Sequence, residues 1–382
     1  MPETEANTTR IQVPYLGNIP RWWLYVPGKL YEFGVRLRLA LYETGYWKPK
    51  ALNNPVISVG NITLGGTGKT PLVEFIARYL TGEGHEVAIL TRGYARQDRR
   101  QSRVVVSDGT QVCATLAEAG DEPLMLARRL QGVKVIVGKN RYANGTWLEA
   151  NQGCEVHLLD DGFQHVQLQR DLNLLVLDAT DPFGGGEMAP FGRLREPLYA
   201  LKRADAIIVT RADQAFDEDE LRWVLSECGV DVPLIFSFHE VTGVHELKDG
   251  KPRAQRSLAG KAVGVVSALG NPDRFEHDVA TLGARVVYRK RLRDHHVYSQ
   301  EDVAETVSAA QQAGAERLVT TEKDAVKLEQ FHFGLMPVSV LEIKARFDDE
   351  VSLKTLLLRT IVRKQKTKRA EDIGRKTSGS GD

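Results

Sequence analysis

The feature that most constrains this chain is a glycine-rich segment at residues 60–70, GNITLGGTGKT. It follows a short β-branched run, Val56 to Val59, and precedes a helical pattern from Pro71 to Tyr79. A strand, a glycine-rich loop and a helix in this order form one βα unit. The backbone N–H groups of such a loop and the N-terminus of the following helix make a concave surface that binds phosphate. The segment therefore predicts an α/β fold with a phosphate site.

The side chains of the loop have separate expected roles. Gly65, Gly66 and Gly68 permit the backbone angles and the close approach that phosphate requires. Lys69 supplies a positive charge, and the Thr70 hydroxyl can bind Mg²⁺. A glycine-rich turn followed by a chance Gly-Lys-Thr is the alternative, but the position between a strand and a helix favours the phosphate site. The candidate nucleotide-binding residues are Gly65, Gly66, Thr67, Gly68, Lys69 and Thr70.

Further strand patterns alternate with helical ones along the first 232 residues. They are Val87 to Thr91, Val104 to Val106, Val133 to Val137, His157 to Asp160, Leu174 to Asp178 and Ala206 to Thr210. Strands alternating with helices predict a doubly wound parallel sheet of the P-loop NTPase type. We expect this domain to occupy residues 45–232.

A second, smaller α/β domain is expected over residues 258–345. Its predicted strands are Ala262 to Ser267, Ala284 to Tyr288, Arg317 to Thr321 and Met336 to Leu341. The intervening residues 233–257 form a linker with hairpin character, because a Lys-Asp-Gly-Lys turn interrupts it at 248–251. A closing helix is predicted at 346–363, a polar extension at 1–18 and a disordered basic tail at 364–382.

Residues 19–44 predict a basic amphipathic helix with aromatic side chains near its start. Such a helix can rest on an anionic bilayer. It can equally pack on its own domain, with Trp22 and Trp23 as core anchors, and for an isolated segment this second interpretation is favoured. The choice needs support from elsewhere in the chain.

Composition excludes several classes of protein. The formal net charge is +1, so no overall positive field indicates a nucleic-acid partner. The cysteines, Cys113, Cys154 and Cys228, are odd in number and have no CxxC spacing, which favours a reducing cytoplasm over a disulfide framework. The sequence has no run of about 18 apolar residues, so no membrane span is predicted.

A pair of carboxylates follows the strand that ends near residue 160. Asp160 and Asp161 are placed at the carboxyl end of this strand, where open α/β sheets bind their ligands. Alone, such a pair is as often a turn or a helix cap as a metal site. Together with the glycine-rich loop it predicts a magnesium site, with the direct ligand left open between the two residues.

Several segments together resemble the tetraacyldisaccharide 4′-kinase family. They are SVGNIT at 58–63, GGTGKTP at 65–71 and DDGFQH at 160–165, followed by TRGY at 91–94, GDEP at 120–123, GRLREP at 192–197, DHH at 294–296 and TEKDAVK at 321–327. The resemblance runs from about Trp22 to Val362. Thr63 stands where the common phosphate-loop pattern has glycine, and the family loop shares this departure.

The resemblance implies ATP- and Mg²⁺-dependent phosphorylation of the 4′-hydroxyl of a tetraacylated glucosamine disaccharide 1-phosphate, which gives lipid IVA in lipid A biosynthesis. It also implies two α/β domains joined by a two-stranded linker, with the nucleotide in the cleft between them. Because this acceptor is embedded in a membrane, the resemblance favours the interfacial helix. It implies a peripheral protein on the cytoplasmic face of the inner membrane, with the anionic membrane surface as a partner and no nucleic acid.

The family match also assigns residue roles. Asp121 is implied as the general base, although alone it would be a helix cap, and its histidine partner best matches His295, with His296 as the alternative. Lys69 would stabilise the β- and γ-phosphate oxygens. The candidate metal ligands are Thr70, Asp160, Asp161 and Glu122. The candidate substrate-binding residues are Arg92, Tyr94, Arg141, Gln164 and Arg193.

Two other functions compete with this one. Thr210-Arg211-Ala212-Asp213 loosely resembles the guanine-reading Asn-Lys-x-Asp of P-loop switch and metallochaperone-type GTPases, but two of its four positions differ. A lipid-binding module without chemistry would leave Lys69, Thr70 and Asp160 with no reason to occur together.

A further segment, Glu322-Lys323-Asp324, is predicted to cap the helix that follows it rather than to act in catalysis.

Overall fold

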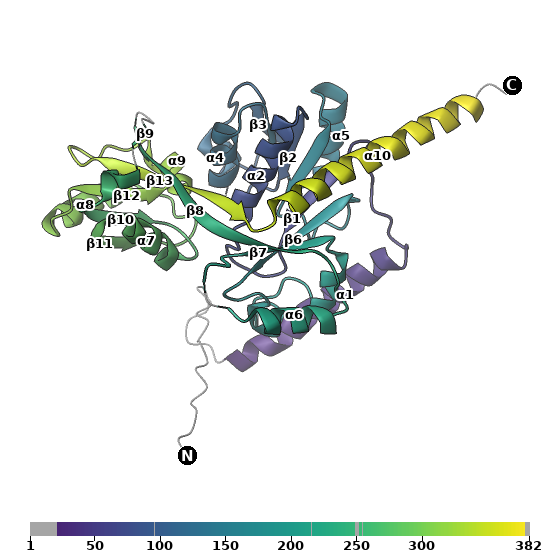
Figure 1. Cartoon of the computed structure of the whole chain (residues 1–382), viewed down its shortest axis with the longest axis horizontal. Helices are drawn as coiled ribbons and strands as arrows, with labels where there is room; N and C mark the ends of the chain where they lie inside the picture. Colours follow the sequence, from purple (N-terminus) through teal and green to yellow (C-terminus); the bar gives the residue numbers. More distant parts are fainter. Residues whose placement is uncertain (1–20, 95, 215, 249–251, 254, 379–382) are drawn as a thin grey trace, which may run out of the picture.

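The computed structural model describes residues 21–94, 96–214, 216–248, 252–253 and 255–378, so the predicted extension at 1–18 lies outside the described residues. Two α/β units lie side by side and share one twisted sheet (Figure 1). The strand order is β11-β10-β12-β13-β8-β7-β6-β1-β5-β2-β4-β3, and β9 pairs with β8 outside this path.

The first unit contains the predicted parallel strands. They are β1 (Val56–Gly60), β2 (Val87–Thr91), β3 (Val104–Asp108), β4 (Lys134–Val137), β5 (Val156–Asp160), β6 (Leu172–Asp178) and β7 (Ala206–Thr210). All pairings within this set are parallel except the edge pairing of β3 with β4. The predicted α/β class with a doubly wound sheet is confirmed.

Helices cover both faces of this part of the sheet. They are α1 (Tyr25–Glu43), α2 (Lys69–Gly82), α3 (Leu116–Ala119), α4 (Asp121–Arg129), α5 (Arg141–Asn151) and α6 (Glu218–Glu227), with 3₁₀ turns η1 (Arg21–Leu24), η2 (Gly184–Gly186) and η3 (Leu198–Arg203).

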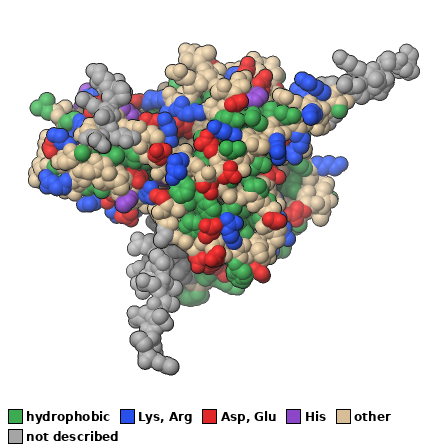
Figure 2. Space-filling view, in the orientation of Figure 1, with side chains coloured by type: hydrophobic (Ala, Val, Ile, Leu, Met, Phe, Trp, Pro, Cys, Tyr) green, Lys and Arg blue, Asp and Glu red, His purple; other side chains and the backbone are tan. Residues whose placement is uncertain are grey.

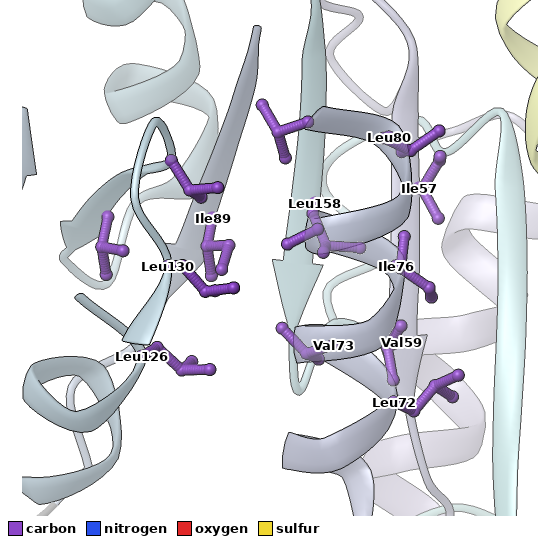
Figure 3. Close-up of a cluster of buried hydrophobic side chains, with 14 of the residues drawn as sticks. Ile57, Val59, Leu72, Val73, Ile76, Leu80, Ile89, Leu126, Leu130 and Leu158 are labelled. Carbon is purple, nitrogen blue, oxygen red and sulfur yellow. The ribbon is translucent and has the colours of Figure 1, made fainter. Parts of the chain in front are cut away.

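The packing of α2 fixes the phosphate loop in space. Leu72, Ile76 and Leu80 recur at helical spacing and are fully buried against Ile57 and Val59 of β1 (Figure 3). Each such leucine or isoleucine stabilises the fold by about 1.5–3 kcal/mol relative to an exposed position. Because β1 and α2 are clamped in this way, the loop between them has a defined start and end.

The second unit has the predicted alternation as well. Its elements are β8 (Leu234–Glu246), β9 (Pro252–Arg253), η4 (Gln255–Leu258), β10 (Ala262–Ser267), α7 (Pro272–Thr281), β11 (Arg285–Arg291), α8 (Gln300–Gln312), β12 (Arg317–Thr321), α9 (Glu322–Leu328) and β13 (Val338–Phe347). The cap residues Asn271 and Ser299 start α7 and α8 by accepting backbone N–H groups.

The connection between the units is made by two long strands. β8 runs antiparallel to β13 from the pair Glu246–Ser339 to the pair Ser237–Phe347, and its first four residues, 234–237, pair in parallel with β7. Only β8 and the short β9 come from the predicted linker at 233–257. The second connecting strand comes from about 100 residues later in the chain, and the local sequence gives no signal of this pairing.

The prediction of a disordered tail from residue 364 was wrong for residues 364–378. Helix α10 (Glu350–Ser378) begins inside the predicted closing helix and continues through this segment, and its end projects from the body of the molecule (Figure 1). The first turns of α10 bury Leu353, Leu357 and Ile361 on the sheet, and lysine, arginine, glutamine and alanine extend a helix that is already nucleated.

Helix α1 lies along the first unit with one face inward and one outward. Val35 and Leu39 are buried in the core, whereas Leu30, Phe33 and Leu37 are at least half exposed. Trp22 and Trp23 of η1 are 63% and 59% exposed, which contradicts the alternative interpretation of them as core anchors. Figure 2 shows hydrophobic side chains along the margin of the molecule where α1 runs. Within the described residues, no helix is long and apolar enough to cross a membrane.

Candidate active site

The phosphate loop is shaped by two glycines and braced from β7. Gly65 and Gly68 adopt φ angles of 115° and 73°, which favour glycine. The Thr210 hydroxyl donates to the carbonyl of Thr67 at 2.8 Å. Because Thr210 is the last residue of β7, this hydrogen bond ties the loop to a second strand besides β1, which leads into it.

Lys69 begins α2 and turns its ammonium group back over the loop. Its Nζ lies 3.1 Å from Asn61 Oδ1 and 3.5 Å from Asp161 Oδ1. A cation held above a surface of backbone N–H groups is the arrangement that the β- and γ-phosphates of a nucleotide require. The structure thus brings Lys69 to the carboxylate pair that the sequence placed at the end of β5.

The two carboxylates of this pair have different surroundings. Asp161, at φ 52°, accepts two hydrogen bonds from Arg195 at 2.8 and 3.0 Å. Burial by itself would raise the pKa of Asp161, but the charges of Lys69 and Arg195 lower it well below the usual range. Asp161 is therefore already neutralised by protein cations.

Asp160 has no such ion-pair partner among the described residues. It is buried and accepts a hydrogen bond from the Thr91 hydroxyl at 3.0 Å. Burial and the negative charges of Glu122 and Asp161 raise its pKa to about 6. A divalent cation would relieve this desolvated charge, so the residues present fit a magnesium ion whose protein contact is Asp160.

The third acidic candidate, Glu122, is engaged with the second unit. Its Oε1 lies 2.9 Å from Nζ of Lys323 on α9. The described part of the chain contains no group of three or more His, Cys, Asp or Glu side chains arranged to hold a metal ion. Mg²⁺ at this edge would therefore take most of its oxygens from phosphate and water, as it commonly does.

Asp121 and His295 meet across the two units. His295 Nδ1 lies 2.9 Å from Asp121 Oδ2, and Asp121 is 5% exposed. Burial alone would raise the pKa of Asp121, but the hydrogen bond from His295 and the charges of Lys323 and Lys327 lower it to about 2. Burial lowers the pKa of His295, yet its bond to Asp121 leaves that pKa raised overall.

The other histidine candidate is placed elsewhere. His296 Nε2 lies 3.1 Å from Asp302 at the start of α8, and the T-shaped contact of its ring is with Tyr298. His295 has a φ of 60°, in the left-handed region, and its ring contacts Asp121 of the first unit. Of the two alternatives that the sequence left open, the structure brings His295 to Asp121.

Two lysines of α9 belong to this site although the sequence analysis missed them. Lys323 Nζ lies 2.9 Å from Glu122, 3.0 Å from Asp294 and 3.4 Å from His295 Nε2. Lys327 Nζ lies 3.7 Å from Asp121 Oδ2. The cap residue of α9 is Thr321, so of the segment predicted to cap the helix only Asp324 takes part, by exchanging hydrogen bonds with the Thr321 hydroxyl. The signal was the segment TEKDAVK, whose lysines share one helix face.

The predicted substrate residues divide between the two sides of the site. The Tyr94 ring lies 5.2 Å from the His295 ring, on the side of the Asp121–His295 pair. Gln164 donates to the carbonyl of Asn61 at 2.7 Å, and Arg193 donates to that of Leu64 at 2.8 Å, so both adjoin the phosphate loop. Arg92 is exposed.

Arg141 and Arg195 complete the basic surroundings. Arg141 begins α5, is buried, and donates to the Lys139 carbonyl at 3.3 Å; burial lowers its pKa against the opposing effect of Asp161 and Asp160. Arg195 holds Asp161 and was missed, because the sequence analysis chose Arg193 from the same segment. Nothing in the sequence distinguished these two arginines.

The residues that suggested a guanine-reading loop have other contacts. Arg211 is ion-paired with Asp178 and donates to the carbonyl of Gly66 at 2.7 Å. Asp213 is ion-paired with Arg274 of α7. Arg211 therefore braces the phosphate loop, and Asp213 joins the two units.

Comparison with known proteins identifies relatives that match most of the chain. A family model described as Tetraacyldisaccharide-1-P 4′-kinase matches residues 20–362. The chain is 39% identical over 315 residues to the tetraacyldisaccharide 4′-kinase of Geobacter metallireducens, which covers 82% of this chain and 90% of that protein. It is 42% identical over 302 residues to that of an Anaeromyxobacter strain, covering 78% and 80% of the two chains.

A solved structure has the same architecture. The crystal structure of LpxK from Aquifex aeolicus in complex with ATP superposes with a TM-score of 0.72 and 32% sequence identity. The match covers 89% of this chain and 99% of that one.

Proposed function

This chain belongs to the LpxK family of tetraacyldisaccharide-1-P 4′-kinases, and we propose that its site transfers the γ-phosphoryl group of ATP to the 4′-hydroxyl of a tetraacyldisaccharide 1-phosphate with Asp121 as the general base. The observation that carries the assignment is the contact of 2.9 Å between Asp121 and His295, which come from different units. The phosphate loop and Asp121 both belong to the first unit, and His295 reaches Asp121 from the second.

Asp121 has the properties of a base for an alcohol. Its low pKa keeps it ionised at neutral pH, and its burial shields it from water. It accepts the proton of the hydroxyl as the oxygen attacks, and assistance of this kind accelerates transfer by about 10²- to 10⁴-fold. His295 orients the carboxylate and supports the charge of the pair.

The remaining groups neutralise phosphate charge. Lys69 contacts the β- and γ-phosphate oxygens, and Arg141 and Arg92 offset the charge that develops on the transferred group. Asp160 and the Thr70 hydroxyl would hold Mg²⁺, which would supply electrostatic stabilisation of the same oxygens. Asp161 keeps Lys69 and Arg195 in place.

We propose further that α1 lies in the surface of the inner membrane on its cytoplasmic side. The outward side chains of η1 and α1 are Trp22, Trp23, Tyr25, Val26, Leu30, Tyr31, Phe33 and Leu37. Aromatic and apolar side chains beside lysine and arginine are the composition of a helix that inserts at the level of the headgroups. This position would bring a membrane-embedded acceptor to the site.

The test is transfer of labelled γ-phosphate from ATP to tetraacyldisaccharide 1-phosphate in detergent micelles with Mg²⁺. Wild-type protein should label the lipid, and Lys69→Ala and Asp121→Ala should not. If no lipid is labelled while GTP is hydrolysed without an acceptor, the protein is a nucleotide switch and the proposal fails.

A further inference from the structure

A buried lysine lies between carboxylates of the two units, where α4 and α9 are neighbours (Figure 1). Nζ of Lys327 lies 2.9 Å from Oδ1 of Asp324 on the same helix and 3.7 Å from Oδ2 of Asp121 on α4. The side chains of Lys327, Asp324 and Asp121 are 7%, 0% and 5% exposed. Among the described residues, Lys327 is the one lysine within 4.0 Å of Asp121. The candidate base therefore shares a buried ammonium group with a carboxylate of the second unit.

The second unit holds Asp324 in one orientation. Its Oδ2 accepts hydrogen bonds from the backbone N–H of Ala268 and from the Thr321 hydroxyl, each at 2.9 Å. Its other oxygen is thereby directed at Lys327. The buried ring of Tyr298 lies 5.3 Å from the same ammonium group and attracts it. These contacts fix the place of the positive charge beside Asp121.

Neutralisation of Asp324 does not by itself explain the position of Lys327. The two residues already form an ion pair three positions apart on one helix. A second buried carboxylate on the same cation introduces repulsion between like charges, which is unfavourable for stability alone. The other lysine of α9 at this site, Lys323, is engaged by Glu122 and Asp294. The contact of Lys327 with Asp121 therefore points to a role at Asp121.

We propose that Lys327 is a positioning residue whose ammonium group, anchored by Asp324, holds the Asp121 carboxylate in the orientation in which it meets His295. This inference rests on the proposed function, in which Asp121 accepts the proton of the acceptor hydroxyl. Lys327 acts through Asp121 and contacts no substrate. A displacement of about 1 Å in a reacting group can cost about 10²-fold in rate. Loss of Lys327 should therefore lower kcat and leave the KM values for ATP and lipid unchanged.

A single substitution cannot separate this role from a purely structural one. Lys327→Met leaves Asp324 buried without a counter-charge, which destabilises the protein in either case. The double variant Lys327→Met with Asp324→Asn removes both charges and keeps an amide oxygen for Ala268 and Thr321. A lysine that only neutralises Asp324 is not needed in this double variant. A lysine that positions Asp121 is still missing from it.

The experiment measures lipid phosphorylation in detergent micelles over ranges of ATP and lipid, together with unfolding in urea. Lys327→Met should lower both the urea midpoint and kcat. The double variant should regain most of the lost stability, while its kcat stays about 10- to 100-fold below wild type and both KM values stay within about twofold. Lys290→Met, which removes a 2.9 Å ion pair with Glu305 inside the second unit, is the control and should leave kcat unchanged.

Recovery of wild-type kcat by the double variant would overturn the proposal, as would a rise in either KM that accounts for the loss of activity. If wild-type protein labels no lipid, the proposed function fails by itself. Nitrogen NMR of labelled histidine then decides the role of Lys327. The ring signals of His295, identified by their absence from His295→Ala, should shift in the double variant, because the carboxylate that the ring contacts is no longer held. Unchanged signals would contradict the inference.

Discussion

Asp121 and Asp160 both belong to the candidate active site, but their electrostatic surroundings are opposite. Against the effect of burial, groups of the second unit lower the pKa of Asp121 to about 2, whereas burial and then negative neighbours raise that of Asp160 to about 6. The protein thus keeps Asp121 ionised, whereas a bound cation would be needed to stabilise the charge of Asp160. The division gives each residue a different expected response to substitution and to pH.

Asp121→Asn should lower kcat by about 10²- to 10⁴-fold, because an amide cannot accept the proton of the hydroxyl. The Kd for ATP should stay near the wild-type value, since the phosphate loop is untouched. Single-turnover transfer and equilibrium nucleotide binding measure the two quantities. A parallel loss of nucleotide binding would show that Asp121 acts through the fold.

His295→Ala should shift the acid limb of the kcat profile to higher pH. His295 is one of the groups that lower the pKa of Asp121, so without it the carboxyl gains its proton at a higher pH. The pH dependence of kcat for both proteins measures this. His296→Ala is the control. An effect of His296→Ala without one of His295→Ala would show that His296, and not His295, acts with Asp121.

The affinity for Mg²⁺ should depend on pH near the pKa of Asp160. Because that pKa is raised to about 6, a proton competes with the metal below this value, and the apparent affinity should fall by about tenfold per pH unit there. Titration of activity with Mg²⁺ between pH 5 and 8 at constant ionic strength measures it. Asp160→Asn should abolish the pH dependence, and its persistence would move the metal contact to another group.

At the scale of elements, the junction of β1 with the phosphate loop permits no side chain at Gly60. A Cβ there would lie 2.5 Å from the backbone nitrogen of Phe163 and 2.7 Å from its Cβ. Phe163 belongs to the segment that follows Asp160 and Asp161. The absence of a side chain at Gly60, the last residue of β1, therefore lets the segment with the carboxylate pair pack against the start of the loop.

Gly60→Ala should reduce the free energy of unfolding by about 1–3 kcal/mol and also impair transfer, because the loop and the carboxylates must separate to admit the methyl group. Thermal and urea unfolding with the kinase assay measure both effects. Gly82→Ala at the end of α2 is the matched control, since a Cβ there meets nothing within 4 Å. A Gly60→Ala protein with full activity would show that the approach is not needed.

At the scale of the whole molecule, Arg129 of α4 joins the two units. It is ion-paired with Glu322 of α9, and its guanidinium lies 3.3 Å from Glu342 of β13 and 2.9 Å from Glu74 of α2. The side chain is 13% exposed, so these carboxylates share one mostly buried cation, although Glu74 also pairs with Arg78 and Glu342 with Lys344. This cluster fixes the orientation in which His295 reaches Asp121.

Arg129→Met should destabilise the protein by about 3–5 kcal/mol, because three carboxylates lose their common partner. Transfer should fall as well, because the contacts that hold the two units together also hold His295 against Asp121. Calorimetric unfolding and kcat/KM measure these changes. Arg78→Met is the control, since Arg78 pairs with Glu74 alone in the described set of ion pairs.

The sequence by itself determined the βα units, the phosphate loop and the acids at the end of β5, because these depend on local patterns of burial, glycine and charge. It also placed Asp121 and His295 in candidate segments through the family resemblance. Only the tertiary structure decided that His295 meets Asp121, that Lys323 joins them and that β13 pairs with β8. Contacts between residues about 100–200 positions apart depend on how whole units pack. Local sequence propensity does not predict that packing.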